Sequence, residues 1–178
     1  TRVGDEAEFE GHMLEVTLGP GMLSRNYDGL QNDLDKMEGV FLRRGEYTFP
    51  LDNDKLWDFK PLAKVGDKVT AGGWLGEVDE NFQPHKIMVP FTFKGEYTVK
   101  SLKEAGQYTI GEVIAVLTDE TGKDVEVTMI QRWPVKRAIT CYKEKPRPYK
   151  LLETGVRTID TVNPIVEGGT GFIPGPFG

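Results

Sequence analysis

The sequence has few of the residues that build most metal and redox sites: one cysteine, Cys141, and two histidines, His12 and His85, in 178 residues. A single cysteine excludes an internal disulfide framework and all-cysteine zinc sites. So few soft ligands argue against a transition-metal centre. The chain also has no apolar run near the ~18 residues of a membrane-spanning helix and no start typical of a signal peptide. These absences favour a cytoplasmic protein.

The sequence also has no excess of basic residues: it contains 22 Lys and Arg and 28 Asp and Glu, which gives a net charge of -6. Proteins that bind nucleic acid usually present a basic face, so the charge balance argues against that class. One stretch, residues 132–150, is locally basic and carries Trp133 and Tyr142. Its prolines favour a solvated linker over a nucleic-acid patch, and we expect no nucleic-acid partner.

Glycine and proline are abundant, with 21 and 11 residues, or about 18% of the chain against a typical ~12%. Short runs rich in β-formers alternate with glycine turns through the middle of the sequence, a pattern typical of an all-β module. The sequence therefore predicts a mainly β fold, a small β-barrel or sandwich over residues 38–135. The predicted strands are residues 40–43, 46–49, 68–70, 74–78, 86–89, 96–102, 113–118 and 125–130.

The flanks of this module have other patterns. Residues 12–18 alternate like a strand, and Leu30, Leu34 and Met37 recur with the spacing of a short amphipathic helix over residues 28–37. Towards the other end, residues 154–162 have room for one or two helical turns. Residues 168–174 then predict a short buried strand that runs into a turn.

Candidates for enzyme chemistry are few. Cys141 lies in the basic stretch with no histidine near it in sequence, which is typical of a bystander thiol. His85 follows Pro84, and we expect it on the surface or in a hydrogen bond. An acidic stretch lacks the glycine and final glutamate of a calcium-binding EF-hand loop, so we interpret it as a solvated turn: Asp52, Asp54 and Asp58. No catalytic residue and no metal ligand is assigned.

Residues 65–78, followed by residues 86–90, resemble the hammerhead pattern of biotinyl and lipoyl carrier domains. Those domains present an attachment lysine at the tip of a tight hairpin. The corresponding hairpin here falls at residues 79–82 and has no lysine, while Lys86 lies on the following strand. We therefore keep the sandwich architecture and reject the carrier chemistry.

The sequence ends in Gly175, Pro176, Phe177 and Gly178, directly after the strand-like run. A phosphate-binding P-loop has the pattern G-x-x-x-x-G-K-[ST] between a strand and a helix. Its backbone N–H groups and lysine bind phosphate, and its hydroxyl holds Mg²⁺. Only the first four positions are present, so we expect no nucleotide to bind well. Because the chain also starts without methionine, we expect it to be a piece of a longer protein.

Several segments together resemble one family, the catalytic A (alpha) subunit of V-type and A-type rotary ATPases. They occur in family order over almost the whole chain, and Gln-Arg-Trp-Pro-Val and Ile-Pro-Gly-Pro-Phe-Gly are quite specific. Asn163 departs from the aromatic residue usual in the family, and residues 138–145 look rearranged. The matching segments are residues 14–23, 27–31, 85–90, 129–136, 154–161 and 168–178.

The resemblance implies a domain plan. Residues 1–20 would end an N-terminal β-barrel, and residues 21–37 would form a connector with a short helix. Residues 38–135 would be the all-β bulge insertion, and residues 136–178 would begin a P-loop α/β nucleotide-binding domain, ending within the P-loop. The family's catalytic lysine, Mg²⁺-binding hydroxyl, general-base glutamate and arginine would all lie beyond Gly178.

The resemblance also implies a function for the parent protein, which would couple ATP hydrolysis or synthesis to H⁺ or Na⁺ transport. It would use Mg²⁺ and ATP, and it would work with a non-catalytic B subunit and a peripheral stalk, peripheral to the membrane. We expect the 178 residues alone to be inactive, with Gly175, Pro176, Phe177 and Gly178 as a partial ATP-binding loop. The alternative is a β-rich interaction module that contacts the stator without catalysis, and strand edges of the isolated piece could pair between copies.

Overall fold

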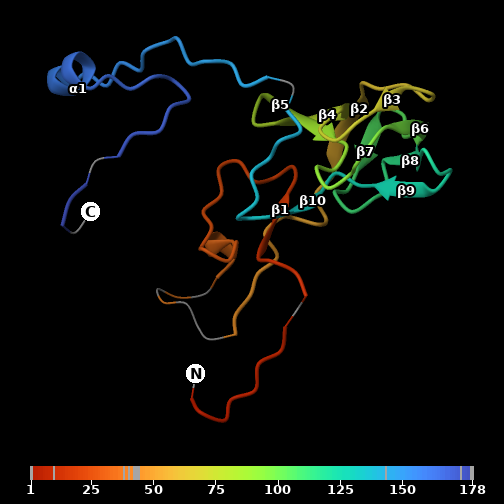
Figure 1. Ribbon diagram of the computed structural model, residues 1–178, viewed down its shortest axis with the longest axis horizontal. Helices are drawn as coiled ribbons and strands as arrows, with labels where there is room; N and C mark the ends of the chain where they lie inside the picture. The colour runs from red at the N-terminus through yellow and green to blue at the C-terminus, as the bar shows by residue number, and fades with distance from the viewer. Residues whose placement is uncertain are drawn as a thin grey trace. The chain divides into compact units, whose positions relative to one another are not determined.

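The computed structural model describes residues 2–9, 11–37, 39, 41, 45–142, 144–172 and 174–176. The chain divides into two compact units, Thr1–Cys141 and Tyr142–Gly178. All but one of the regular elements belong to the first unit, whose strands are labelled in Figure 1.

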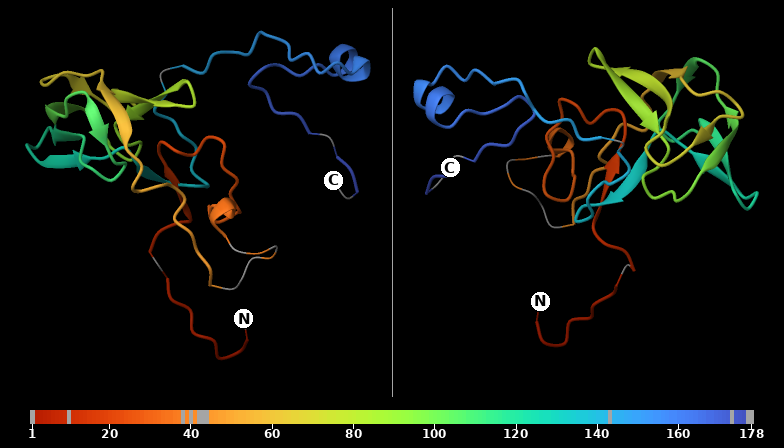
Figure 2. Two further views of the ribbon diagram at one scale, coloured as in Figure 1. Left: turned by 180° about the vertical axis from the view of Figure 1, so that it is seen from behind. Right: turned by 45° about the horizontal axis from the view of Figure 1, so that its top comes forward.

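One four-stranded antiparallel sheet has the order β5-β4-β2-β7. Its strands are β2 (Trp57–Pro61), β4 (Trp74–Glu80), β5 (Gln83–Met88) and β7 (Gly106–Tyr108). In β2, the buried side chains of Trp57 and Phe59 alternate with exposed Asp58 and Lys60, the period-2 pattern of a strand with one buried face. Strands β4 and β5 form a hairpin that extends from the rest of the sheet (Figure 2).

The second four-stranded antiparallel sheet has the order β3-β6-β8-β9. Its strands are β3 (Lys68–Val69), β6 (Tyr97–Leu102), β8 (Ala115–Asp119) and β9 (Asp124–Val127). A tight turn joins β8 to β9, and within it Asp119 Oδ1 accepts hydrogen bonds from the backbone N–H groups of Thr121 and Lys123 at 2.8 and 2.9 Å. These bonds replace ladder partners in the turn and hold the register of the hairpin.

The module has two apolar cores, and β4 contributes to both. Val78 belongs to the larger core with Phe59, whereas Leu75 belongs to the smaller one with Leu117. A register shift between Trp74 and Gly76 lets neighbouring residues of β4 face inward, as a β-bulge does. The larger core contains Leu51, Trp57, Phe59, Val78, Ile87, Ile110, Ile114 and Met129, and the smaller contains Leu75, Val89, Val99, Ala115, Leu117 and Val127.

A separate two-stranded sheet joins the two ends of this module. Strand β1 (Glu15–Leu18) pairs with β10 (Gln131–Pro134), from Glu15 opposite Pro134 to Leu18 opposite Gln131. Both strands lie side by side in Figures 1 and 2. Buried Trp133 packs edge-on against Phe91, and its Nε1–H donates to the Arg137 carbonyl at 2.8 Å.

The segment after β1 is irregular, and two predictions fail there. The helix predicted over residues 28–37 is replaced by a turn and a three-residue 3₁₀ helix, η1 (Leu34–Lys36). Asp28 explains the difference, because its carboxylate accepts hydrogen bonds from the N–H groups of Leu30 and Asn32 and competes with helical bonding. Residues 46–49 form no strand either, and the predicted strand 40–43 lies mostly outside the described residues.

In the second unit, the predicted helical turns are confirmed as α1 (Arg157–Val162). Asp160 accepts hydrogen bonds from the N–H and hydroxyl of Thr154, and the hydroxyl bond is the main cause of the lowered pKa of its carboxyl. The buried strand predicted at residues 168–174 is wrong for the described residues 168–172, which are exposed and form no strand. Phe172 is 86% exposed.

The predicted fold class is confirmed: the protein is mainly β, with strands near those predicted from residue 68 to residue 127. Its sheets are open rather than closed into a barrel over the described residues. Strands β2, β7 and β10 were not predicted. In the part of the chain that the structure describes, no helix is long and apolar enough to cross a membrane.

Candidate functional site

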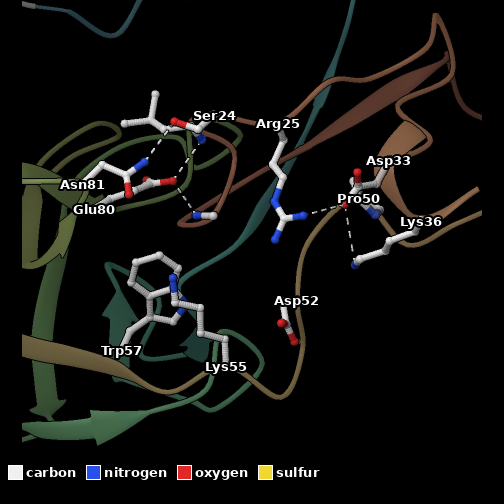
Figure 3. Close-up of a pocket in the computed structure, with 12 residues that line it drawn as sticks. Ser24, Arg25, Asp33, Lys36, Pro50, Asp52, Lys55, Trp57, Glu80 and Asn81 are labelled. Carbon is white, nitrogen blue, oxygen red and sulfur yellow. Dashed lines mark hydrogen bonds and ion pairs between the residues drawn. The ribbon is translucent and has the colours of Figure 1, made fainter.

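A polar cavity of about 290 Å³ lies in the first unit, where three segments distant in sequence meet (Figure 3). One wall is the loop after β1, another is the tip of the β4–β5 hairpin, and the third is the segment that leads into β2. Its charged and aromatic lining residues are Arg25, Asp33, Lys36, Asp52, Lys55, Trp57 and Glu80.

Glu80 holds two of these walls together. Its side chain is 3% exposed, and its Oε1 accepts hydrogen bonds from the backbone N–H groups of Gly21 and Leu23 at 2.7 and 3.0 Å. The other oxygen, Oε2, lies 2.6 Å from Nδ1 of His85 across the hairpin. A buried carboxylate is stable only with such partners, so Glu80 fixes the loop after β1 onto β4.

Asp33 lies further along the segment after β1, at the start of η1. Its carboxylate is 1% exposed, and its Oδ1 accepts a hydrogen bond from the N–H of Asp35. Two cations approach the other oxygen, Arg25 Nη1 at 3.6 Å and Lys36 Nζ at 3.8 Å. Both distances exceed those of hydrogen bonds. The two cations therefore share the buried negative charge of Asp33. In Figure 3 the Arg25 guanidinium points into the space between the walls of the cavity.

The third wall is Trp57, the first residue of β2, with Lys55 before it. The Lys55 ammonium lies 3.9 Å from the centroid of a Trp57 ring, a cation–π contact. The indole is 4% exposed, yet its Nε1–H has no hydrogen-bond partner. Buried polar groups are normally paired, so the unpartnered indole donor marks this wall as a place where a further acceptor would be favourable.

The partial phosphate loop predicted from sequence lies in the other unit. Gly175 and Pro176 are exposed, and no hydrogen bond is made by either within the described residues. Pro176 has no backbone N–H to offer a phosphate. Phe177 and Gly178 lie outside the described residues. The residues described here do not supply the lysine, hydroxyl and helix N-terminus that would hold Mg²⁺ and ATP.

The other sequence candidates are dispersed. Asp52 lines the cavity and accepts from the N–H of Asp54, while Asp58 in β2 accepts from Gln107 across the sheet. Cys141 is half-buried beside Gly72. Within the described ranges, no cluster of three His, Cys, Asp or Glu residues is arranged to hold a metal ion.

Comparison with known proteins identifies the family. Residues 48–136, half of the chain, match the family model of the ATP synthase alpha/beta subunit barrel-sandwich domain. The chain belongs to this family. The match covers both four-stranded sheets and β10, which confirms the resemblance seen in the sequence.

Curated relatives are similar to this chain over nearly its whole length. The V-type ATP synthase alpha chain of Treponema denticola is 48% identical over 180 residues, covering 99% of this chain and 31% of the relative. The proteins of that name in Borrelia garinii and Treponema pallidum (there, alpha chain 1) are 48% and 46% identical over 99% of this chain. This chain thus spans about a third of the length of these relatives.

The cavity itself was not predicted from the sequence. Its charged residues are separated by up to 55 positions, from Arg25 to Glu80, and only the folded hairpin brings them together. Local sequence signals existed at one wall, where Trp57 and Phe59 alternate with Asp58 and Lys60. That alternation predicts a strand and hence a buried tryptophan beside Lys55.

Proposed function

We propose that this chain acts as part of the catalytic alpha subunit of a V-type rotary ATPase, to which it contributes the barrel-sandwich module and its flanking segments. The observation that carries the proposal is the 48% identity to a V-type ATP synthase alpha chain over 99% of this chain. Identity at that level over both units makes a shared role in the same subunit the simplest explanation. Residues 1–20, 21–37, 38–135 and 136–178 remain the proposed divisions.

The activity proposed for the whole subunit is ATP hydrolysis or synthesis coupled to H⁺ or Na⁺ transport, with Mg²⁺ and ATP as cofactor and substrate. Gly175 to Gly178 would be the first positions of its phosphate loop. The 178 residues alone would be inactive, because in-line phosphoryl transfer needs a P-loop lysine, a metal-binding hydroxyl and further cationic groups. The expected result is that ATP turnover in a pure preparation does not rise with the concentration of the chain.

The proposed partners are the non-catalytic B subunit and the peripheral stalk, in the cytoplasm and peripheral to the membrane through the assembly. The module's role in that assembly would be contact with the stator, since its surface carries large apolar side chains. Phe82 at the tip of the β4–β5 hairpin is 99% exposed, and Trp74 at the start of β4 is 57% exposed. Exposed aromatic side chains are enriched in protein interfaces.

A chimera tests the proposal. The 180 matched residues of the Treponema denticola alpha chain are replaced by this chain, and the assembled complex is assayed for ATP hydrolysis and ion transport. We expect assembly and coupled activity to be retained. A matched chimera with Phe82→Ser and Trp74→Ser should keep the fold and lose stalk contact or coupling.

Two results would contradict parts of this proposal. If the first chimera folds but does not assemble, the chain does not act in this subunit. If the double-serine chimera assembles and couples as well as the first, the module's exposed aromatic residues do not contact the stator.

A further inference from the structure

The polar cavity bounded by Arg25, Lys36, Lys55 and Trp57 has more hydrogen-bond donors than partners. Within the described residues, the Arg25 guanidinium and the Lys36 ammonium form ion pairs only with Asp33, each beyond hydrogen-bond distance. The Lys55 ammonium makes no ion pair with any described residue and lies over the Trp57 ring. A guanidinium has five N–H donors and an ammonium three, so most of these donors are unused.

The carboxylates that line the same cavity are already engaged. Glu80 uses both of its oxygens on Gly21, Leu23 and His85. Asp33 accepts from the N–H of Asp35 and faces two cations. Asp52 accepts from the N–H of Asp54, and Figure 3 shows its carboxylate turned away from Arg25. Among the described residues, Oδ2 of Asp52 makes no hydrogen bond or ion pair, so the unused groups of this cavity are mostly donors.

The Trp57 indole adds an independent observation. Its Nε1 is buried and unpartnered, in a side chain that is 4% exposed and lines the cavity. Leaving a buried donor unpaired costs free energy. An acceptor that reached the Trp57 Nε1–H would recover that cost.

We propose that this cavity binds a small oxyanion, a phosphate or carboxylate group, between Arg25, Lys36 and Lys55, with the Trp57 indole N–H as a fourth donor. Charge-assisted hydrogen bonds to oxyanions are about twice as strong as neutral ones, and the guanidinium fork fits two oxygens of one such group. At about 290 Å³, the cavity has room for the anion together with water. The site contains none of residues 175–178 and does not depend on the function proposed for the whole subunit.

Nuclear magnetic resonance of the ¹⁵N-labelled 178-residue chain tests this site. The sequence has three tryptophans, Trp57, Trp74 and Trp133, so three indole N–H signals report at once and single Trp→Phe variants assign them. Sodium phosphate is titrated at constant ionic strength against sodium chloride. We expect a saturable shift confined to the Trp57 indole signal, with a dissociation constant on the order of 1 mM for a few charge-assisted contacts.

A matched pair of variants separates the site from general charge effects. Lys55→Met keeps the aliphatic stem over the indole and removes the charge, so it should weaken phosphate binding about tenfold. Lys103→Met removes the same charge from a lysine over Tyr108 in another part of the module, and it should leave binding unchanged. A second titration with sodium acetate shows whether a lone carboxylate suffices or phosphate is required.

Saturation by phosphate, by acetate or by both, lost in Lys55→Met and kept in Lys103→Met, supports the site and identifies the anion class. The proposal is overturned if neither anion gives a saturable shift of the Trp57 signal up to ~50 mM, far above the expected constant. It is equally overturned if the two lysine variants weaken binding alike, because the effect would then be nonspecific attraction.

Discussion

In this module, single side chains join segments that are far apart in the sequence, and Glu80 is the clearest example. One carboxylate accepts from two backbone N–H groups almost 60 positions away and from His85 on the next strand. Gln31 acts similarly for β1: its amide donates to the Thr17 carbonyl and accepts from the Thr17 N–H, both at 2.7 Å. Each side chain completes hydrogen bonding that the backbone alone leaves open.

Replacing Glu80 tests this account of the loop after β1. Glu80→Ala would leave the partly buried N–H groups of Gly21 and Leu23 without their acceptor, so we expect the free energy of unfolding to fall by about 2 kcal/mol. Glu80→Gln keeps an acceptor oxygen, so it should lower the free energy of unfolding by less. Urea denaturation measures both, with exposed Glu126→Ala on β9 as the control. Equal losses for Gln and Ala would show that the charge, not the accepted hydrogen bonds, holds the loop.

Gly76 shows how a missing side chain sets the distance between elements. A Cβ at this position in β4 would lie 2.2 Å from Cε2 of Phe59 in β2 and 2.8 Å from the Lys60 carbonyl oxygen. We expect Gly76→Ala to lower the free energy of unfolding by about 3 kcal/mol, because the packed core cannot yield. Gly111→Ala meets no atom within 4 Å and serves as the matched control in the same denaturation series.

Strand prediction from the sequence worked where turns and β-formers alternate clearly, as for β3 to β6, β8 and β9. It missed β7, which is only three residues long. It failed for β2 and β10 because Asp58 and Pro134 carry signals typical of loops, although the alternation of Trp57 and Phe59 was present. The predicted helix at residues 28–37 failed because Leu30, Leu34 and Met37 share its spacing by chance while Asp28 favours a turn. The cavity could not be predicted, since its walls meet through contacts between residues far apart in sequence, such as those of Glu80 and the hydrogen bond from Asn81 to Ser24.

The β4–β5 hairpin turns through two residues with positive φ, Asn81 at 53° and Phe82 at 64°. Asparagine tolerates this region, but for most residues it costs ~1–2 kcal/mol. Phe82 is 99% exposed, so its ring offers no packing in return. We expect Phe82→Gly and Phe82→Asn to raise the urea midpoint and Phe82→Val to lower it. A lower midpoint for the glycine variant would mean that the ring stabilises the hairpin.

At the scale of the whole molecule, exposed carboxylates make stability depend on pH. The pKa of Asp119 is lowered mainly by the Thr121 hydroxyl, and that of Asp124 mainly by the Lys100 ammonium. Lys86 likewise lowers the pKa of Glu77. A lowered pKa in the folded state contributes stability above the ordinary values of 3.8 for Asp and 4.5 for Glu, and that contribution is lost as the pH falls through the folded value.

We therefore expect the urea midpoint to be nearly constant from about pH 7 to pH 5 and to fall steadily below about pH 4.5. Asp119→Asn removes one of these groups and should flatten the fall. If the urea midpoint of Asp119→Asn falls as steeply at acid pH as that of the parent chain, the pH dependence comes from other carboxylates.

The pairing of β1 with β10 has a mechanical consequence. Glu15 and Pro134 lie opposite each other at one end of the ladder, so tension applied at Leu14 and Val135 opens the pair like a zipper, one rung at a time. Separating hydrogen-bonded pairs one at a time needs less force than pulling a packed core apart. This short ladder would therefore open first, before either core unfolds. Stretching single molecules from these two positions should give an early extension of about 3 nm before the cores unfold, and stretching from Leu18 and Gln131 should not.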